Sequence, residues 1–183
     1  MLVAGGAGAV GHAAIQLAVW AGATVITTVS SPSKAELARA AGAHHVVDYR
    51  AEDAVAAIQA LAPAGVDIVV EVNPAANIRL DAEVAALDAT VSIYAGNEEP
   101  VAVPVRPSMA KNVRYQFLLT YTVPAADKEA AVRAVAAAAA DGALAVGADA
   151  GLPITRFPLA ETAAAHDAVE AGVVGKVLID VAN

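Results

Sequence analysis

The sequence contains no cysteine and few aromatic residues. Without Cys, disulfides and thiolate-bound metals are excluded, and a cytoplasmic location is the default expectation. Aromatic residues make up 4% of a chain that is 58% hydrophobic, so Ala and Val must fill the core. The net charge is −8 and no cluster of Lys and Arg is present. We therefore expect no nucleic-acid partner, because phosphate binding requires a concentrated basic surface.

Long apolar runs and targeting signals are also missing. No uninterrupted apolar run approaches the ~18 residues that a transmembrane helix needs. The first residues lack the basic start and the small-residue cleavage site of a secretory signal. We expect no membrane partner, and the length of 183 residues suits one good hydrophobic core.

Short apolar runs alternate with helix-period stretches over the first half of the chain. Strands are predicted at 2–4, 24–29, 45–47, 66–70 and 89–94, and helices at 10–21, 34–41, 53–61 and 75–87. This alternation is typical of a parallel sheet with helices on both faces. The predicted fold class is therefore α/β, a doubly wound Rossmann sheet.

The alternation stops after residue 96. Residues 97–111 hold three Pro and are predicted to be a loop, 113–121 a further strand, and 127–142 an Ala-rich helix that ends at Gly142. Residues 151–183 are predicted to form a strand, a helix and a second strand. We therefore divide the chain into a nucleotide-binding domain, 1–150, and a C-terminal tail, 151–183.

The glycine cluster after the first predicted strand fits the pattern G-x-G-x-x-G. In such a motif Gly6 permits the tight turn, Gly8 lets the backbone approach a pyrophosphate, and Gly11 lets the helix pack on the strand. The helix that begins here offers free N–H groups to phosphate oxygens. The alternative, a Gly/Ala-rich turn without a ligand, is disfavoured because strand, turn and helix follow in the required order.

The end of the second predicted strand indicates which dinucleotide is bound. A carboxylate normally follows there when the ligand is NAD, but this sequence has Ser30, Ser31 and Lys34 instead. Hydroxyls and an ammonium group could hold an additional phosphate. Tyr49 and Arg50, after the third strand, could reach the same place. This pattern favours NADP over NAD, although Ser30 and Ser31 could simply cap a helix beside a solvated Lys34.

The whole chain resembles the zeta-crystallin type of quinone oxidoreductase, within the medium-chain dehydrogenase/reductase superfamily. The matching stretches are VAGGAGAVGHAAIQLA, SSPSKAELARAAGAHHVVDYRAED, GVDIVVEV, SMAKNVRYQF, FPLAETAAAHDAVEAG and GKVLIDV. In that family a catalytic domain precedes the glycine turn. The resemblance therefore implies the cofactor-binding domain and the C-terminal tail, which is expected to pack toward that catalytic domain.

The resemblance also implies which residues bind NADP(H). The residues so assigned to the pyrophosphate, the 2′-phosphate and the nicotinamide half are Gly6, Gly8, Ala9, Val10, Gly11, Ser30, Ser31, Lys34, Tyr49, Asn73, Tyr94, Gly96, Asn97, Leu119 and Tyr121. No catalytic residue and no metal ligand is assigned. His12, directly after the glycine motif, is predicted to pack near the start of the helix.

The activity implied by the resemblance is hydride transfer from NADPH to a small quinone or an α,β-unsaturated carbonyl. Three alternatives stay open: the cofactor half of a zinc-type alcohol dehydrogenase, that of an enoyl reductase, and a non-catalytic NADP-binding module. Relatives pair the last strand of the sheet with its copy. A homodimer through the edge strand 113–121 is therefore expected.

Overall fold

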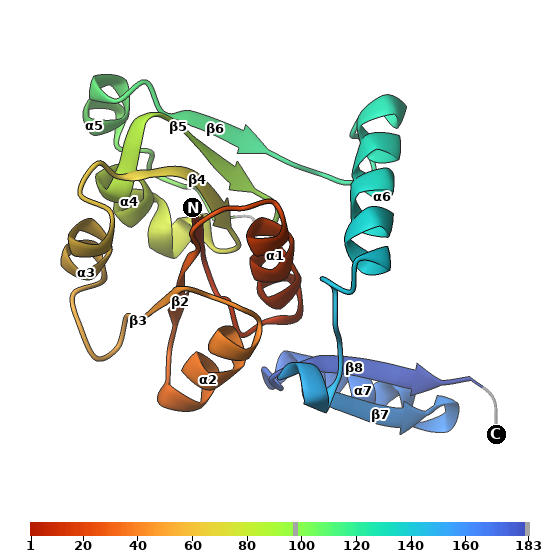
Figure 1. The fold of residues 1–183 in the computed structure, drawn as a ribbon. Coiled ribbons are helices and arrows are strands. Elements are labelled where there is room, and N and C mark those ends of the chain that lie inside the picture. The colour runs from red at the N-terminus through yellow and green to blue at the C-terminus, as the bar shows by residue number, and fades with distance from the viewer. Residues whose placement is uncertain (97–98, 182–183) are drawn as a thin grey trace.

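A six-stranded parallel sheet forms the centre of the molecule. The computed structural model describes residues 1–96 and 99–181. The strand order is β3-β2-β1-β4-β5-β6 (Figure 1), with every neighbouring pair parallel. The strands are β1 (Leu2–Val3), β2 (Ile26–Val29), β3 (His45–Asp48), β4 (Val66–Glu71), β5 (Ala85–Ile93) and β6 (Arg114–Phe117). This order reverses between β1 and β4, and it confirms the predicted Rossmann fold.

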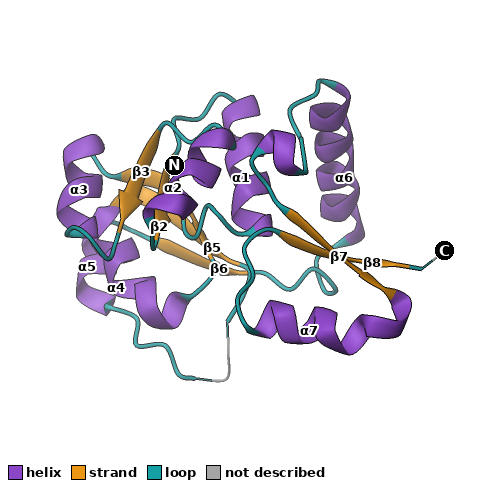
Figure 2. Ribbon diagram, turned by 90° about the horizontal axis from the view of Figure 1, so that it is seen from below, coloured by secondary structure: helices purple, strands orange, loops and turns teal. Residues whose placement is uncertain are grey.

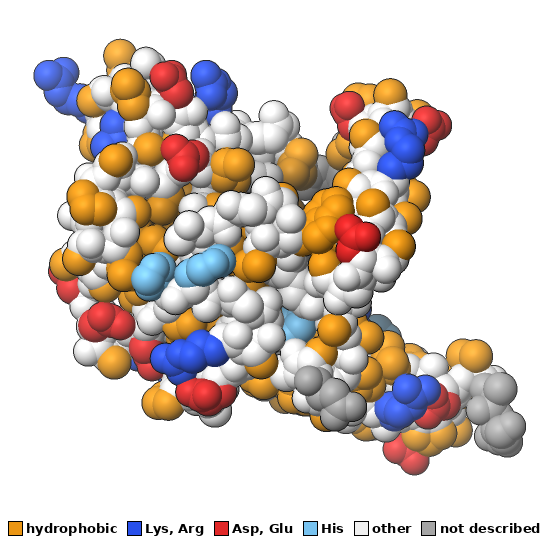
Figure 3. All heavy atoms as spheres, in the orientation of Figure 1, with side chains coloured by type: hydrophobic (Ala, Val, Ile, Leu, Met, Phe, Trp, Pro, Cys, Tyr) orange, Lys and Arg blue, Asp and Glu red, His pale blue; other side chains and the backbone are white. Residues whose placement is uncertain are grey.

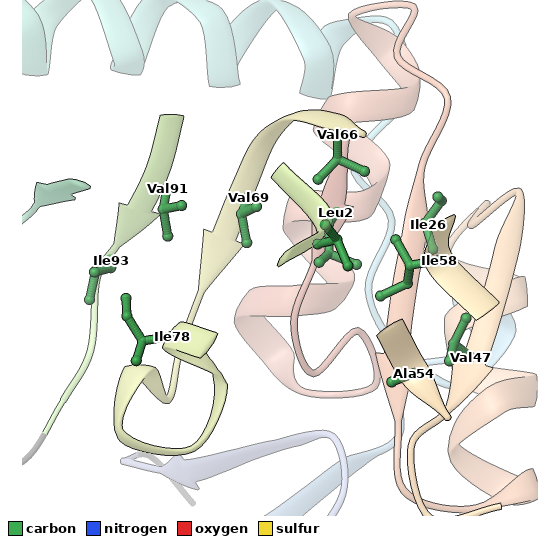
Figure 4. Packing of buried hydrophobic residues seen from close by; sticks show 11 residues of the cluster. Leu2, Ile26, Val47, Ala54, Ile58, Val66, Val69, Ile78, Val91 and Ile93 are labelled. Atoms are coloured by element: carbon green, nitrogen blue, oxygen red, sulfur yellow. The ribbon is translucent and has the colours of Figure 1, made fainter. Parts of the chain in front are cut away.

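Helices cover both faces of the sheet (Figure 2). Successive strand residues point to opposite faces, so Leu2 and Val3 belong to different cores. Val3 packs with α1 (Ala9–Trp20) and α2 (Pro32–Ala40), whereas Leu2 packs with α3 (Ala54–Leu61) and α4 (Pro74–Val84). Figure 4 shows the second core, in which aliphatic side chains from the strands meet Ile58 and Ile78. Val and Ala therefore do supply most of the packing.

Local capping explains where two of these helices begin. The Ser31 hydroxyl accepts a hydrogen bond from the Lys34 backbone N–H at 3.3 Å, and Pro32 occupies the first turn of α2. The Asp53 carboxylate accepts one from the Ala56 N–H at 3.1 Å at the start of α3. The capping role considered for Ser31 is thus present in the structure.

Two boundaries differ from the sequence prediction. The helix predicted to reach residue 87 ends at Val84, and β5 begins at once with Ala85. Gly65 explains the early strand, because a Cβ there would lie 2.5 Å from the Ala86 nitrogen, so the two segments must run side by side. Within the predicted loop, residues Val105–Ala110 form the short helix α5. Its proline, Pro107, is tolerated because the first-turn N–H groups of a helix need no partner within the helix.

The last third of the chain lies beside the sheet domain (Figure 1). Helix α6 (Ala125–Ala140) stands next to α1 and has one buried residue, Ala138, among its described positions. The turn η1 (Ala148–Ala150) leads to β7 (Ile154–Pro158), the turn η2 (Leu159–Glu161), α7 (Thr162–Glu170) and β8 (Lys176–Asp180). Strands β7 and β8 pair in parallel as a separate two-stranded sheet, which confirms the predicted strand-helix-strand tail.

Exposed hydrophobic side chains mark this last third. Figure 3 shows them on α6 and over the tail, and Val132 of α6 is 66% exposed. None of the helices in the described part of the chain has the length and apolar character to span a membrane.

Truncating a core side chain tests the packing described above. Ile58 is fully buried between α3 and the sheet, so Ile58→Ala is expected to lower the free energy of unfolding by about 2–5 kcal/mol in a urea titration. Leu61→Ala, on the same helix but at a 41% exposed position, should change it by less than about 1 kcal/mol. Equal losses for the two variants would contradict this assignment of the core.

Candidate functional site

The turn between β1 and α1 is held by backbone hydrogen bonds. The Gly6 N–H donates to the Thr28 carbonyl at 3.2 Å, and the Gly8 N–H donates to the Gly5 carbonyl at 3.0 Å. Gly5, directly before the predicted turn residue Gly6, has a φ of +68°, the left-handed backbone region that favours glycine. Gly6 is needed for a different reason: a Cβ there would lie 2.1 Å from the Thr27 hydroxyl oxygen.

The two later glycines of the motif differ in their surroundings. A Cβ on Gly11 would lie 2.3 Å from the Gly5 carbonyl oxygen, so Gly11 allows α1 to approach the turn, as predicted. A Cβ on Gly8 would meet nothing closer than that same oxygen at 3.4 Å. The protein itself therefore does not require glycine at position 8. Space for a ligand beside the backbone gives a reason for it.

The N-terminus of α1 begins at this open position. Gly8 caps the helix without a side-chain hydrogen bond, and Ala9, Val10 and Gly11 form its first turn. The N–H groups of a first turn have no acceptor within the helix, and the helix dipole adds partial positive charge there. Val10 is 54% exposed, so this end of α1 is open to an anionic ligand.

A cation and hydroxyl groups lie together after β2. The Lys34 ammonium donates to the Ser30 hydroxyl at 3.1 Å, and the Ser31 and Ser33 hydroxyls are 3.0 Å apart. The Ser31 hydroxyl also accepts from the Lys34 backbone, so α2 fixes the direction of this cluster. No described carboxylate forms an ion pair with Lys34. The cluster therefore presents an uncompensated positive charge with hydroxyl donors around it.

One cavity of about 300 Å³ joins the glycine turn to this cluster. Its wall contains four of the predicted binding residues, which are Gly8, Ser30, Lys34 and Tyr49. Sequence reasoning missed the other wall residues, which are Gly5, Ala7, Thr28, Val29, Val72 and the tail loop 172–175. Glycines at both ends of GVVG were the sequence signal for that loop, but nothing local indicated that it would lie against this cavity.

Not every predicted residue joins this cavity. Asn73 and Gly96 line a different cavity of about 360 Å³ at the ends of β4 and β5, and Tyr94 is half-buried nearby. Burial raises the pKa of Tyr94, and the negative charge of Glu71 raises it further. Asn97 lies outside the described residues.

Strand β6 is shorter than the predicted strand 113–121. It ends at Phe117, and the Thr122 N–H donates to the Leu119 carbonyl at 2.9 Å in a turn toward α6. Leu119 and Tyr121 are 58% and 88% exposed and are not in the wall of either cavity, so their contacts with the nicotinamide half stay predictions.

Two buried acids line an adjoining cavity of about 240 Å³, which also has Tyr49 and Val72 in its wall. Glu71 accepts hydrogen bonds from the Asn73 backbone and from the Asn77 amide, the latter at 3.0 Å. Burial raises the pKa of Glu71, and these hydrogen bonds oppose the rise. Neither carboxyl oxygen of Asp81 has a hydrogen-bond partner among the residues that the structure describes. Burial, followed by the negative charge of Glu71, raises the pKa of Asp81 to about 8. Asp81 is therefore protonated at neutral pH.

Comparison with known proteins adds the following findings. The family described as zinc-binding dehydrogenase has a model that matches residues 9–137. A 2-haloacrylate reductase from a Burkholderia species is 40% identical over 70 residues, which cover 38% of this chain and 21% of that protein. A probable quinone oxidoreductase from Leishmania amazonensis is 42% identical over 71 residues, with the same two coverages.

A solved structure matches almost the whole chain. A mycobacterial protein complexed with NADPH superposes with a TM-score of 0.81 and 28% sequence identity, over 97% of this chain and 55% of that one. The chain thus spans about half the length of the solved relative, and the aligned part is about a fifth of each curated relative.

The buried Asp81 predicts a pH-dependent stability. The pKa of Asp81 is raised from its ordinary value of 3.8 to about 8 in the folded chain, so the folded chain binds more protons than the unfolded chain between these two pH values. Protonation of Asp81 therefore contributes to the stability of the folded chain. This contribution is fully present below pH 4 and is lost as the pH rises toward 8. Between pH 5.5 and pH 8, Asp81 should lower the free energy of unfolding by about 2–3 kcal/mol.

Replacing Asp81 by Asn should remove this pH-dependent loss of stability. We expect Asp81→Asn to unfold at higher urea concentration than the unsubstituted chain at pH 8, with a smaller difference at pH 5.5. Glu83→Gln, at an exposed position of the same helix, is the control and should leave the pH profile unchanged. A parallel pH profile for Asp81→Asn and the unsubstituted chain would contradict the assignment.

Proposed function

Because the chain belongs to the zinc-binding dehydrogenase family, we propose that it is the NADPH-binding part of an oxidoreductase. The predicted resemblance to the medium-chain dehydrogenase/reductase superfamily is confirmed. The observation that carries the proposal is that Lys34 and Ser30 line the same cavity as Gly8. One cavity therefore offers a place for a pyrophosphate and, beside it, a cationic place for a second phosphate.

The described residues and cavities offer places for several parts of NADPH. The first turn of α1 would hold the pyrophosphate, and Ser30, Ser31, Lys34 and Tyr49 would surround the 2′-phosphate. The adjoining cavity, with Tyr49 at its wall, would receive the adenine base. The cavity beside Asn73 and Gly96 would hold the nicotinamide half. These places lie along the carboxyl ends of the strands, where open α/β sheets bind ligands.

The proposed reaction is the reduction of a quinone or an α,β-unsaturated carbonyl compound. NADPH would supply the hydride. The chain's own residues would bind and orient the cofactor, and no catalytic residue is assigned among them. The names of the matched relatives, a probable quinone oxidoreductase and a 2-haloacrylate reductase, support this substrate class.

Zinc does not fit the described residues, in spite of the family's description. Residues 1–96 and 99–181 contain no group of three His, Cys, Asp or Glu side chains that could hold a metal ion. The chain also has no cysteine. No step of the proposed function is therefore assigned to a metal bound by these residues.

Strand β6 supports a further part of the proposal, a homodimer. It is the last strand of the sheet, so one side of it has no neighbouring strand in the described part of the chain and could pair with a second copy. Phe117, the last residue of β6, is 63% exposed. The surface proposed for pairing is Arg114–Phe117, shorter than the segment predicted from the sequence.

Removing the cation tests the proposed cofactor. Lys34→Ala should raise the Kd for NADPH by about ten- to a hundredfold, the loss typical of a hydrogen bond to a charged group, and leave the Kd for NADH unchanged. Cofactor fluorescence measures both constants. Lys128→Ala, on α6 and outside the cavity, is the matched control. An unsubstituted chain that binds NADH as tightly as NADPH would contradict the 2′-phosphate site.

Alanine substitutions at Gly8 and Gly6 should change different properties, the first cofactor binding and the second stability. Gly8→Ala leaves room for its Cβ within the protein but narrows the ligand space, so the Kd for NADPH should rise at least about tenfold with an unchanged Tm. Gly6→Ala forces a contact with Thr27 and should lower the free energy of unfolding by about 1–3 kcal/mol. Calorimetric titration and thermal unfolding separate the two effects. Unchanged NADPH binding by a folded Gly8→Ala variant would contradict the placement of the pyrophosphate.

A further inference from the structure

Three polar side chains lie at four-residue intervals along α1. His12, Gln16 and Trp20 therefore share one face of the helix. All three form hydrogen bonds to the segment 141–150, which joins α6 to the tail. Figure 1 shows this segment running from the end of α6 past α1 to β7. The helix that begins at the proposed pyrophosphate site thus also holds the connection to the tail.

Gln16 makes the most complete of these contacts. Its amide oxygen accepts from the Ala145 N–H at 2.8 Å, and its amide nitrogen donates to the Ala145 carbonyl at 3.1 Å. The same nitrogen donates to Nδ1 of His12 at 2.8 Å. Nδ1 is then the acceptor of the imidazole, so Nε2 carries the proton and donates to the Ala150 carbonyl at 2.9 Å. His12 is 1% exposed, which confirms that it packs at the helix start.

Close contacts continue from this segment to the cavity wall. A Cβ on Gly151 would lie 2.3 Å from the Ala40 Cβ, so the chain here lies directly on α2. Two residues later, the Pro153 carbonyl accepts from the Lys176 N–H at 2.8 Å. A Cβ on Gly175 would lie 2.1 Å from that carbonyl oxygen. The position of residues 150–153 therefore fixes the loop 172–175, which is part of the cavity wall.

We propose that His12 and Gln16 are positioning residues for the cofactor, because they hold the tail loop 172–175 against the cofactor cavity. The proposal rests on the proposed function, in which that cavity takes NADPH. A loop that contacts the cofactor only when the tail is docked links the two equilibria. NADPH then favours the docked tail by the same factor by which docking favours NADPH.

A purely structural role for the polar face is the competing explanation. Leu152 is 1% exposed, so apolar packing also anchors the start of the tail. If that packing alone places the loop, loss of the Gln16 hydrogen bonds should lower stability without changing either the loop or the cofactor affinity. Hydrogen exchange of the loop and the Kd for NADPH separate the two explanations.

The experiment compares the full chain with Gln16→Leu and the matched control Gln59→Leu. Gln59 also donates to a backbone carbonyl, that of Glu83 at 3.3 Å, but lies outside the cofactor cavity. In Gln16→Leu the amides of 172–180 should exchange about tenfold faster without cofactor, and the Kd for NADPH should rise about tenfold. In the unsubstituted chain NADPH should slow exchange of the same amides. Gln59→Leu should match the unsubstituted chain in each measurement.

The outcomes distinguish this inference from the proposed function. An unsubstituted chain that binds no NADPH overturns the proposed function, and the cofactor-free exchange rates still test whether Gln16 docks the loop. A Gln16→Leu chain that exchanges and binds NADPH like the unsubstituted chain overturns the inference. Gln16→Glu keeps the acceptor for the Ala145 N–H and should give an intermediate Kd. If Gln16→Leu does not fold, a Gln16→Glu Kd equal to that of the unsubstituted chain overturns the inference instead.

Discussion

The close packing of the glycine turn against β2 is the constraint on which the rest of the structure depends. Gly6 lies where any side chain would collide with Thr27, and Gly11 lies against the Gly5 carbonyl. These two contacts fix both the position and the direction of α1. The first turn of the helix consequently faces the end of β2, where Ser30 and Lys34 lie. The pyrophosphate and 2′-phosphate places proposed for NADPH follow from this one arrangement.

The cavity is assembled from segments that are far apart in the sequence. The turn at 5–8 and the cluster at 28–34 belong to the first βαβ unit, whereas 172–175 belongs to the tail. The polar face of α1 connects the two through Gln16 and Ala145. One helix thus offers its N-terminus to the cofactor and its side to the chain that carries the outer wall. In the proposed cofactor site, the tail therefore supplies part of the cavity wall.

Features with a local cause could be predicted from the sequence. The parallel order follows from the alternation of apolar runs and helical periods. The Ser31 cap and the Ser30–Lys34 contact depend on residues at most four positions apart. Boundaries set by distant contacts could not be predicted in this way. The early start of β5 depends on the approach of Gly65 to Ala86. The end of β6 depends on a turn toward α6, in which the Thr122 N–H donates to the Leu119 carbonyl.

The least predictable features depend on tertiary contacts that the local sequence does not identify. Asp81 has the helical spacing of a core position next to Ile78 and Ala82, and only the fold reveals that it is buried beside Glu71 without a partner. The contact of the tail loop with the cavity likewise arises from tertiary packing.

A crystal structure of the chain grown with NADPH would test the central claim most directly. We expect electron density for the pyrophosphate at the first turn of α1. We also expect electron density for the 2′-phosphate within hydrogen-bonding distance of the Ser30 hydroxyl and the Lys34 ammonium. A 2′-phosphate directed into solvent, or a dinucleotide bound away from the glycine turn, would contradict it.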